Sequence, residues 1–155
     1  MSLLQSKIEA FLLEEPVAKY YAEQMNAISY FKDKIFSDNY GFGYSKNINP
    51  KIINEFNEYL AAIKKDGSYN YILKKWTEEF NSLKNRNKEL TGVNGVIKAG
   101  FNLEVSPFSY IENREILGFE VDLLYRFAKL FGYKIEITSL TTEEQIKNIK
   151  IIILI

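Results

Sequence analysis

The clearest alternation of secondary-structure patterns lies in residues 96–138, VIKAGFNLEVSPFSYIENREILGFEVDLLYRFAKLFGYKIEIT. Val96 to Phe101 is apolar and predicts a strand. An amphipathic helical pattern runs from Phe119 to Phe131, and Gly132 is placed to end that helix. Tyr133 to Thr138 predicts a second strand. A strand, a helix and another strand in this order indicate an α/β fold.

The segment between the first strand and the helix reads as irregular structure with one short extended piece. A loop is predicted around Pro107, followed by extended chain from Phe108 to Ile111 and a turn over Glu112–Glu115.

Two helices are predicted on the N-terminal side of this stretch. Asn49 and Pro50 have the residue types of an N-cap and a first helical position. Gly67 ends the first helix, and Ser68 is predicted to cap the second. The apolar positions recur at helical spacing in both: Ile52, Ile53, Phe56, Tyr59, Leu60 and Ile63, then Ile72, Leu73, Trp76 and Phe80.

Shorter patterns complete the reading of the chain. Lys7–Leu13 and Tyr40–Tyr44 are expected to be strands, and Pro16–Met25 a helix. Thr141 and Glu144 form a capping-box pattern, and Ile149–Ile155 is expected to be a last strand.

Composition removes several classes of function. The chain of 155 residues has neither Cys nor His, which excludes thiol catalysis, imidazole acid–base chemistry, disulfides and a Cys/His zinc site. Its 20 basic and 20 acidic residues cancel, so no global charge favours nucleic acid or an anionic membrane. The start of the chain lacks the pattern of a signal peptide. We therefore expect either a cytosolic protein or a segment whose leader is left off.

Residues 95–137 resemble the opening of the family 3 extracellular solute-binding proteins, the polar-amino-acid receptors of ABC importers. The resemblance rests on Gly95–Asn102, on Ser106–Ile111 and on Leu117–Leu123. It implies a periplasmic-binding-protein-like lobe with a mixed sheet flanked by helices, in which the loop after the first strand lines the ligand cleft.

Residues 8–80 resemble the end of the same family. The matching segments are Ala10–Tyr21, Tyr40–Tyr44 and Asn49–Trp76. The end of one domain thus precedes the start of another. This order predicts the end of one solute-binding domain over residues 1–80, a linker over 81–94 and the start of a second domain over 95–155. A single permuted domain is the alternative. In both cases the resemblance implies that residues 41–80 and 95–137 dock into one lobe.

The resemblance also implies a set of ligand-binding residues. Glu14 stands where the family places an Asp that binds the ligand's ammonium group, although an acid there also suits a helix N-terminus. The cleft loop contains three further candidates, Asn102, Val105 and Phe108. The family has an Asp near the position of Asn102 and an aromatic residue near that of Val105. Glu120 is a further candidate contact, although it and Asp122 also fit the start of a helix.

The family's second charged contact is not matched. Its members have a Thr-x-Thr-x-Glu-Arg segment whose Arg binds the ligand carboxylate. Thr141–Lys147 is similar to this segment but has Gln145 in the position of the Arg. Because Gln carries no charge, the chain is expected to bind amino acids weakly or not at all.

The resemblance implies a binding protein rather than an enzyme, with no cofactor and no metal. Its partners would be an amino-acid-like solute and an ABC permease, outside the cytoplasm in the periplasm or at the cell surface. Two alternatives stay open: the sensing region of a membrane sensor kinase, and a dehydratase-like enzyme of the same fold. Lys150–Ile155 is apolar, and as an edge strand it would favour a homodimer.

Overall fold

The computed structural model describes residues 10, 12–30, 43–45, 48–80, 89–141 and 143–144. The chain divides into two compact units, Met1–Asp38 and Asn39–Ile155. In the first unit, helix α1 spans Glu15–Gln24 and has Pro16 in its first turn, which confirms the helix predicted there. The strand predicted over Lys7–Leu13 is not found at Leu12 or Leu13, and most of its other positions lie outside the described residues.

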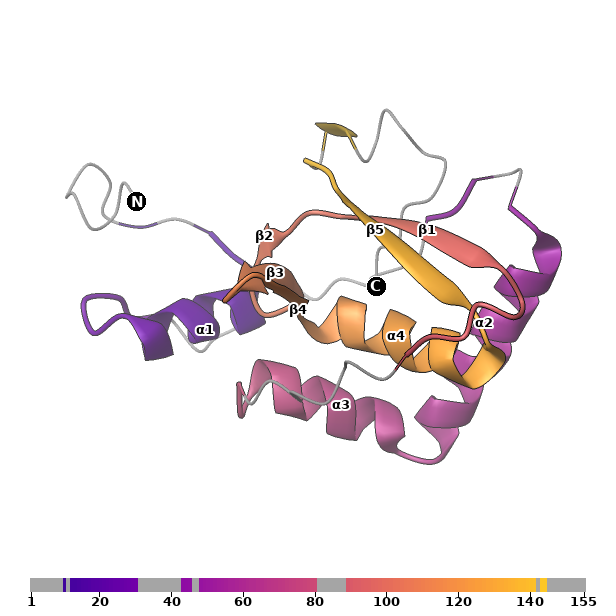
Figure 1. Ribbon diagram of the computed structural model, residues 1–155. Helices are drawn as coiled ribbons and strands as arrows, with labels where there is room; N and C mark the ends of the chain where they lie inside the picture. Colours follow the sequence, from indigo (N-terminus) through magenta and orange to yellow (C-terminus); the bar gives the residue numbers. More distant parts are fainter. Residues whose placement is uncertain are drawn as a thin grey trace. The chain divides into compact units, whose positions relative to one another are not determined.

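The second unit is built on a strand–helix–strand motif. Strands β1 (Val96–Phe101) and β5 (Lys134–Ser139) pair in parallel, from Val96 opposite Lys134 to Phe101 opposite Ser139. Helix α4 (Phe119–Phe131) connects them and lies along one face of the pair (Figure 1). These three elements and the α/β fold class are confirmed.

A three-stranded antiparallel sheet lies between β1 and α4 in the chain. It consists of β2 (Glu104–Val105), β3 (Ser109–Glu112) and β4 (Glu115–Leu117), in that order. Asn113 and Arg114 form the tight turn between β3 and β4, with φ of 50° and 68°. Two residues with positive φ are typical of a type I′ hairpin turn. The predicted turn is confirmed, whereas β2 and β4 are too short for their sequence to have predicted them.

Helices α2 (Pro50–Lys65) and α3 (Ser68–Thr77) form a consecutive pair. The side chain of Asn49 accepts a hydrogen bond from the Lys51 amide at 3.0 Å, as expected of an N-cap. The predicted cap of α3 is wrong: Gly67 occupies the N-cap position, and Ser68 is the first helical residue. The Ser68 amide donates to the Asp66 carboxylate at 2.8 Å. The helix ends before Phe80, which is therefore not part of its apolar face.

One hydrophobic core joins α2 and α3 to the strand–helix–strand motif. The deepest point of contact is Trp76 of α3, which is 1% exposed and donates from its indole nitrogen to Asp122 of α4 at 3.0 Å. Figure 1 shows α3 running beside α4. The buried members of the core are Tyr59, Ile63, Ile72, Trp76, Ile97, Ala99, Phe101, Leu103, Tyr110, Leu117, Phe119, Val121, Leu123, Leu124, Phe127, Ala128, Tyr133 and Ile135. The predicted docking of residues 41–80 onto 95–137 is thus confirmed for the described residues.

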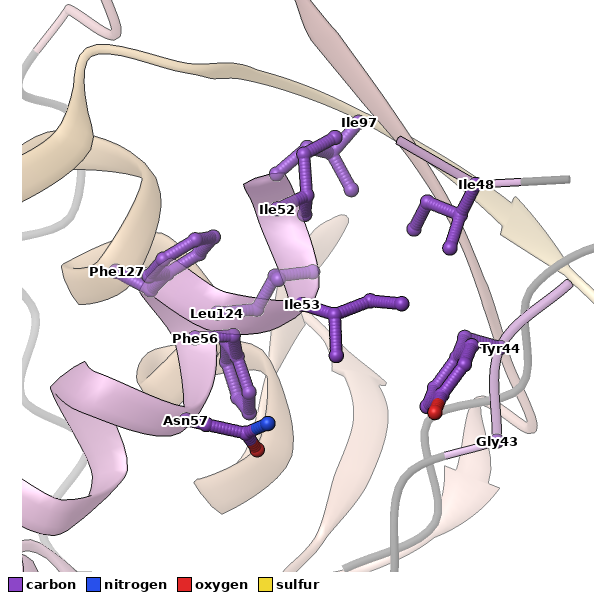
Figure 2. A pocket seen from close by; sticks show the side chains of 10 residues that line it. All are labelled: Gly43, Tyr44, Ile48, Ile52, Ile53, Phe56, Asn57, Ile97, Leu124 and Phe127. Carbon is purple, nitrogen blue, oxygen red and sulfur yellow. The ribbon is translucent and has the colours of Figure 1, made fainter. Parts of the chain in front are cut away.

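An apolar pocket of about 180 Å³ remains where α2 meets β1 and α4. Figure 2 shows that hydrocarbon side chains make up most of its wall, with the Tyr44 hydroxyl and the Asn57 amide as its polar groups. The lining residues are Gly43, Tyr44, Ile48, Ile52, Ile53, Phe56, Asn57, Ile97, Leu124 and Phe127. None of them carries a charge, so the pocket has no group that could pair with a charged solute.

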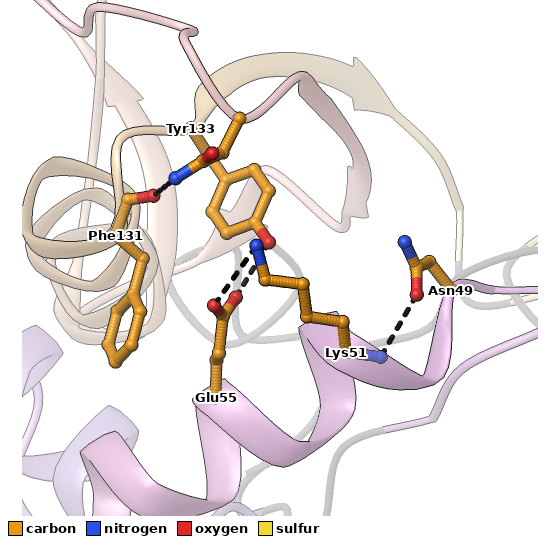
Figure 3. Close-up of polar contacts among 6 residues, drawn as sticks. Asn49, Lys51, Glu55, Phe131 and Tyr133 are labelled. Carbon is orange, nitrogen blue, oxygen red and sulfur yellow. Dashed lines mark hydrogen bonds and ion pairs between the residues drawn. The ribbon is translucent and has the colours of Figure 1, made fainter.

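A polar contact fixes the N-terminal half of α2 to the start of β5. The Tyr133 hydroxyl donates to the Glu55 carboxylate at 2.6 Å, and Lys51 forms an ion pair with the same carboxylate at 3.5 Å (Figure 3). Burial and the bond to Glu55 raise the pKa of Tyr133 to about 12. The tyrosine therefore stays protonated and remains a donor at neutral pH.

Replacing Tyr133 with Phe is expected to lower the free energy of unfolding of the second unit by about 1 kcal/mol, because the ring stays and one hydrogen bond is lost. Urea unfolding followed by fluorescence of the single tryptophan measures this. Tyr125→Phe in α4 is the control. It removes the same hydroxyl group from another tyrosine and should lower the free energy of unfolding less than Tyr133→Phe does. An unchanged midpoint in Tyr133→Phe would contradict the contact.

The remaining local patterns have mixed outcomes. The capping box is confirmed: the Glu144 amide donates to the Thr141 hydroxyl at 3.2 Å, and the Thr141 amide donates to the Glu144 carboxylate at 2.8 Å. Tyr44 forms an isolated bridge, and most of the strand predicted over Tyr40–Tyr44 lies outside the described residues, as does Ile149–Ile155. Over the described ranges, no helix is both long and apolar enough to cross a membrane.

Candidate functional site

The candidate site is the loop that follows β1, residues 102–108, which we call the site loop. It begins at the carboxyl end of a parallel strand, where ligands of open α/β sheets bind. Three of the five predicted ligand-binding residues lie on it: Asn102, Val105 and Phe108. All three are partly buried, so each has some surface that a solute can reach.

Short-range hydrogen bonds shape the site loop. The Asn102 side chain accepts from the Glu104 amide at 3.2 Å, and the Phe108 amide donates to the Val105 carbonyl at 2.8 Å. The Ser109 hydroxyl donates to the main-chain carbonyl of Asn102 at 2.9 Å. The last of these bonds joins the two ends of the loop, so the loop is a closed structure that is anchored at its base.

The start of α4 is docked onto the same loop. The amides of Phe119 and Glu120, the first two of the helix, donate to the carbonyls of Pro107 and Phe108 at 3.1 and 3.0 Å. Gly118, just before the helix, has φ of 130° and ψ of 166°. A Cβ atom at Gly118 would lie 2.0 Å from the Phe108 carbonyl oxygen. Only glycine therefore permits this close approach of helix and loop.

Glu120 brings a carboxyl group into the base of the loop. Its side chain lies within hydrogen-bonding distance of the Ser109 hydroxyl, at 3.2 Å. Burial raises the pKa of Glu120 to about 7, and the bond from Ser109 opposes this shift. Glu120 was predicted either as a ligand contact or as an acid that complements the helix start. The structure places it in the first turn of α4, bonded to Ser109.

Four of the five predicted site residues are therefore brought together. Asn102 and Glu120 contact the same Ser109 hydroxyl, Val105 bonds to Phe108, and the Phe108 carbonyl accepts from the Glu120 amide. Their contact with a ligand stays a prediction.

Glu14 belongs to the first unit. It is exposed and occupies the N-cap position of α1, where its carbonyl accepts from the amides of Val17 and Ala18 at 3.0 Å. Its carboxylate makes no capping hydrogen bond. The side chain is thus not used in holding the helix end, and its predicted role toward an ammonium group stays a prediction.

Asp122 has a different role from the one predicted. It is 3% exposed, and its carboxylate accepts from the Trp76 indole and from Arg126, both at 3.0 Å. The acid therefore links α3 to α4 within the core and does not serve the helix N-terminus through solvent. The reason is that a buried indole N–H needs an acceptor, and Asp122 lies on the face of α4 that α3 covers.

Ser109 is the functional candidate that sequence reasoning missed. It lies between two aromatic residues, Phe108 and Tyr110, and is 3% exposed. A small hydroxyl residue within an aromatic run next to the predicted cleft loop is a weak signal of a buried hydrogen-bonding position. Its two hydrogen-bond partners, Asn102 and Glu120, are 7 and 11 residues away along the chain, so no local pattern indicates them.

Thr141–Lys147, the segment similar to the one whose Arg binds the ligand carboxylate in the family, is described only in part. Thr141 and Glu144 are bonded to each other, and Gln145 lies outside the described residues. In the part of the chain that the structure describes, no three carboxylate side chains gather closely enough to hold a metal ion.

Comparison with known proteins supports the resemblance. Residues 97–151 match the family model of the bacterial extracellular solute-binding proteins, family 3. The chain is 29% identical over 80 residues to a probable histidine-binding protein of Campylobacter jejuni, an alignment that covers 51% of the chain and 31% of that relative. Residues 97–151 are therefore similar to the family 3 solute-binding proteins, and this segment contains the site loop and α4.

The chain spans about a third of the length of the curated relative that it matches. No solved structure matches the chain. The described α/β fold is consistent with a partial periplasmic-binding-protein-like lobe, but its parallel and antiparallel strands form two separate sheets and not the single mixed sheet expected.

Proposed function

We propose that the chain is part of an extracytoplasmic solute-binding protein that captures an amino acid or a similar small polar solute for an ABC importer. The observation that carries this proposal is the site loop, which lies at the carboxyl end of β1 inside the segment that matches family 3. The relative's description as a probable histidine-binding protein supports an amino acid as the solute class.

The chemistry of the site loop suits such a solute. Asn102 and Phe108 offer an amide and an aromatic ring, and Glu104 offers an exposed carboxylate next to them. A carboxylate near a partly buried surface attracts an ammonium group, and the aromatic ring provides apolar contact. No side chain of the described site loop is cationic, so the ligand's own carboxylate lacks a charged partner there.

We expect weak binding for this reason. A solute-binding protein of this fold closes two lobes over its ligand, so that both charged groups of an amino acid are paired as water leaves. Loss of one buried charge-pairing group typically costs about 2–5 kcal/mol. We therefore expect affinities for amino acids in the millimolar range or weaker. Calorimetric titration with a panel of amino acids that includes histidine measures this.

Amide chemical shifts locate the weak binding. With histidine added to tens of millimolar, we expect the amides of residues 102–109 to shift, while those of α2 beside the apolar pocket stay unchanged. The absence of any shift in the site loop for the whole panel would contradict the proposal. Micromolar binding that disappears in Glu14→Ala would contradict the expected weakness and would indicate a complete cleft that includes the first unit.

A further inference from the structure

The base of the site loop holds a buried carboxyl group whose hydrogen bonding is complete only when it carries a proton. We propose that Glu120 is a proton-sensitive positioning residue: in its neutral form it donates to the Ser109 hydroxyl, which donates to the Asn102 carbonyl and holds the site loop against α4. Loss of that proton weakens the chain of bonds, so the loop is held more tightly in acid than in alkali.

A count of protons carries the argument. The Ser109 hydroxyl lies 2.9 Å from the Asn102 carbonyl oxygen and 3.2 Å from a Glu120 carboxylate oxygen. Both oxygens are acceptors when Glu120 is ionised, yet a hydroxyl has only one proton to donate. One of the two acceptors is then left without that donor. A proton on Glu120 removes the conflict, because the carboxyl then donates to the hydroxyl and the hydroxyl donates to the carbonyl.

The amides at the start of α4 do not relieve the conflict. A helix N-terminus normally favours a carboxylate, because its first amides are free to donate. Here the amides of Phe119 and Glu120 donate instead to the carbonyls of Pro107 and Phe108. They are thus directed at the loop backbone and not at the carboxyl group of Glu120.

No neighbouring charge contributes to the raised pKa of Glu120. Its pKa is raised to about 7 by burial, and the bond from Ser109 is the remaining contribution. The elements packed against α4 carry charged or titratable groups, none of which adds to this shift. These groups are Glu112 and Tyr110 on β3, Glu115 on β4, Tyr69, Tyr71, Lys74 and Lys75 on α3, Lys51, Glu55, Glu58, Tyr59, Lys64 and Lys65 on α2, and Lys134 and Glu136 on β5. On α4 itself, Asp122 bonds to Trp76 and Arg126.

Unfolding as a function of pH tests the proposal. An acid whose pKa is about 7 when folded and about 4.3 when unfolded takes up a proton on folding between these values. Its contribution to stability is full below the unfolded pKa and is lost as the pH rises through 7. Relative to Glu120→Gln, whose amide donates at every pH, the wild-type folding constant should fall on the order of a hundredfold from pH 5 to pH 8.

Two further variants separate this effect from general changes in charge and packing. Glu104→Gln removes an exposed carboxylate from the same loop and should keep the wild-type pH profile. Ser109→Ala removes the hydroxyl that accepts from the neutral Glu120 carboxyl, so the neutral form loses this bond and the difference in stability between pH 5 and pH 8 should become smaller. Carboxyl carbon NMR of Glu120 should show a titration midpoint near 7. A midpoint near 4.5, or parallel profiles for wild type and Glu120→Gln, would overturn the proposal.

The consequence for ligands rests on the proposed function, whereas the titration does not. If the site loop binds amino acids, the weak affinity measured by amide shifts should be higher at pH 6 than at pH 8 in wild type and unchanged in Glu120→Gln. A failed Glu120 titration overturns this inference alone, and a normal titration without any ligand-induced shift overturns the proposed function alone.

Discussion

Replacing Trp76 with Ala is expected to lower the free energy of unfolding of the second unit by about 3–5 kcal/mol. The indole is 1% exposed, packs edge-on against Tyr110 at 6.4 Å between ring centres, and donates to Asp122. Its removal leaves a large cavity between α3 and α4 and takes a donor from a buried carboxylate. Urea unfolding followed by far-ultraviolet circular dichroism measures the loss, since the variant has no tryptophan left.

Tyr71→Ala is the matched control for this prediction. Tyr71 is on the same helix and is 57% exposed, so its truncation should change stability by less than about 0.5 kcal/mol. Trp76→Phe should lie between the two, because it keeps an apolar ring and loses the hydrogen bond. Equal stability of Trp76→Ala and Tyr71→Ala would mean that α3 does not pack on α4, and the single core of residues 50–77 and 96–139 would be wrong.

Gly118→Ala is expected to cost about 3 kcal/mol or more. The added methyl group would lie 2.0 Å from the oxygen and 2.4 Å from the carbon of the Phe108 carbonyl, and 2.8 Å from Cα of Ser109. All three atoms belong to the main chain, so no side-chain rotation relieves the overlap. The helix start must therefore separate from the site loop, which breaks the bonds from Phe119 and Glu120 to the loop carbonyls.

Gly67→Ala separates the effect of this close contact from that of the backbone angle. Gly67 also has a positive φ, 83°, but a methyl group there meets nothing within 4 Å. Its substitution should cost about 1–2 kcal/mol, from conformational strain alone. Amide chemical shifts of residues 102–109 should change in Gly118→Ala and not in Gly67→Ala. Equal losses of stability with an unchanged site loop would show that the helix and the loop are not in contact at Gly118.

The core is compatible with the predicted order, in which the end of one family-like domain precedes the start of another. The apolar faces of α2 and α3 pack against α4 and share one core with β1 and β5. Phe127 of α4 contacts Phe56 and Tyr59 of α2 at ring distances of 5.0 and 5.8 Å. These contacts require that the apolar faces of the helices meet, and they do not require a particular order of the helices along the chain. The predicted linker over 81–94, and the choice between tandem domains and a permuted one, stay predictions.

Features that depend on neighbours along the chain could be read from the sequence. Asn49 and Pro50 begin α2, Gly132 ends α4, and Thr141 with Glu144 forms a capping box, because in each case a donor or acceptor finds its partner within a few residues. The apolar periodicity of residues 119–131 likewise predicted the helix and the burial of Leu123, Leu124 and Phe127. Its prediction for Leu130 is wrong, because that side chain is 69% exposed.

Features that depend on burial and on distant partners were settled only by the tertiary structure. Asp122 and Glu120 are two residues apart and look alike in the sequence, yet one accepts from Trp76 and the other shares Ser109 with Asn102. Strands β2 and β4 exist because β3 lies between them. The raised pKa of Glu120 has the same origin, since burial in the folded chain disfavours the charged form of the carboxyl group.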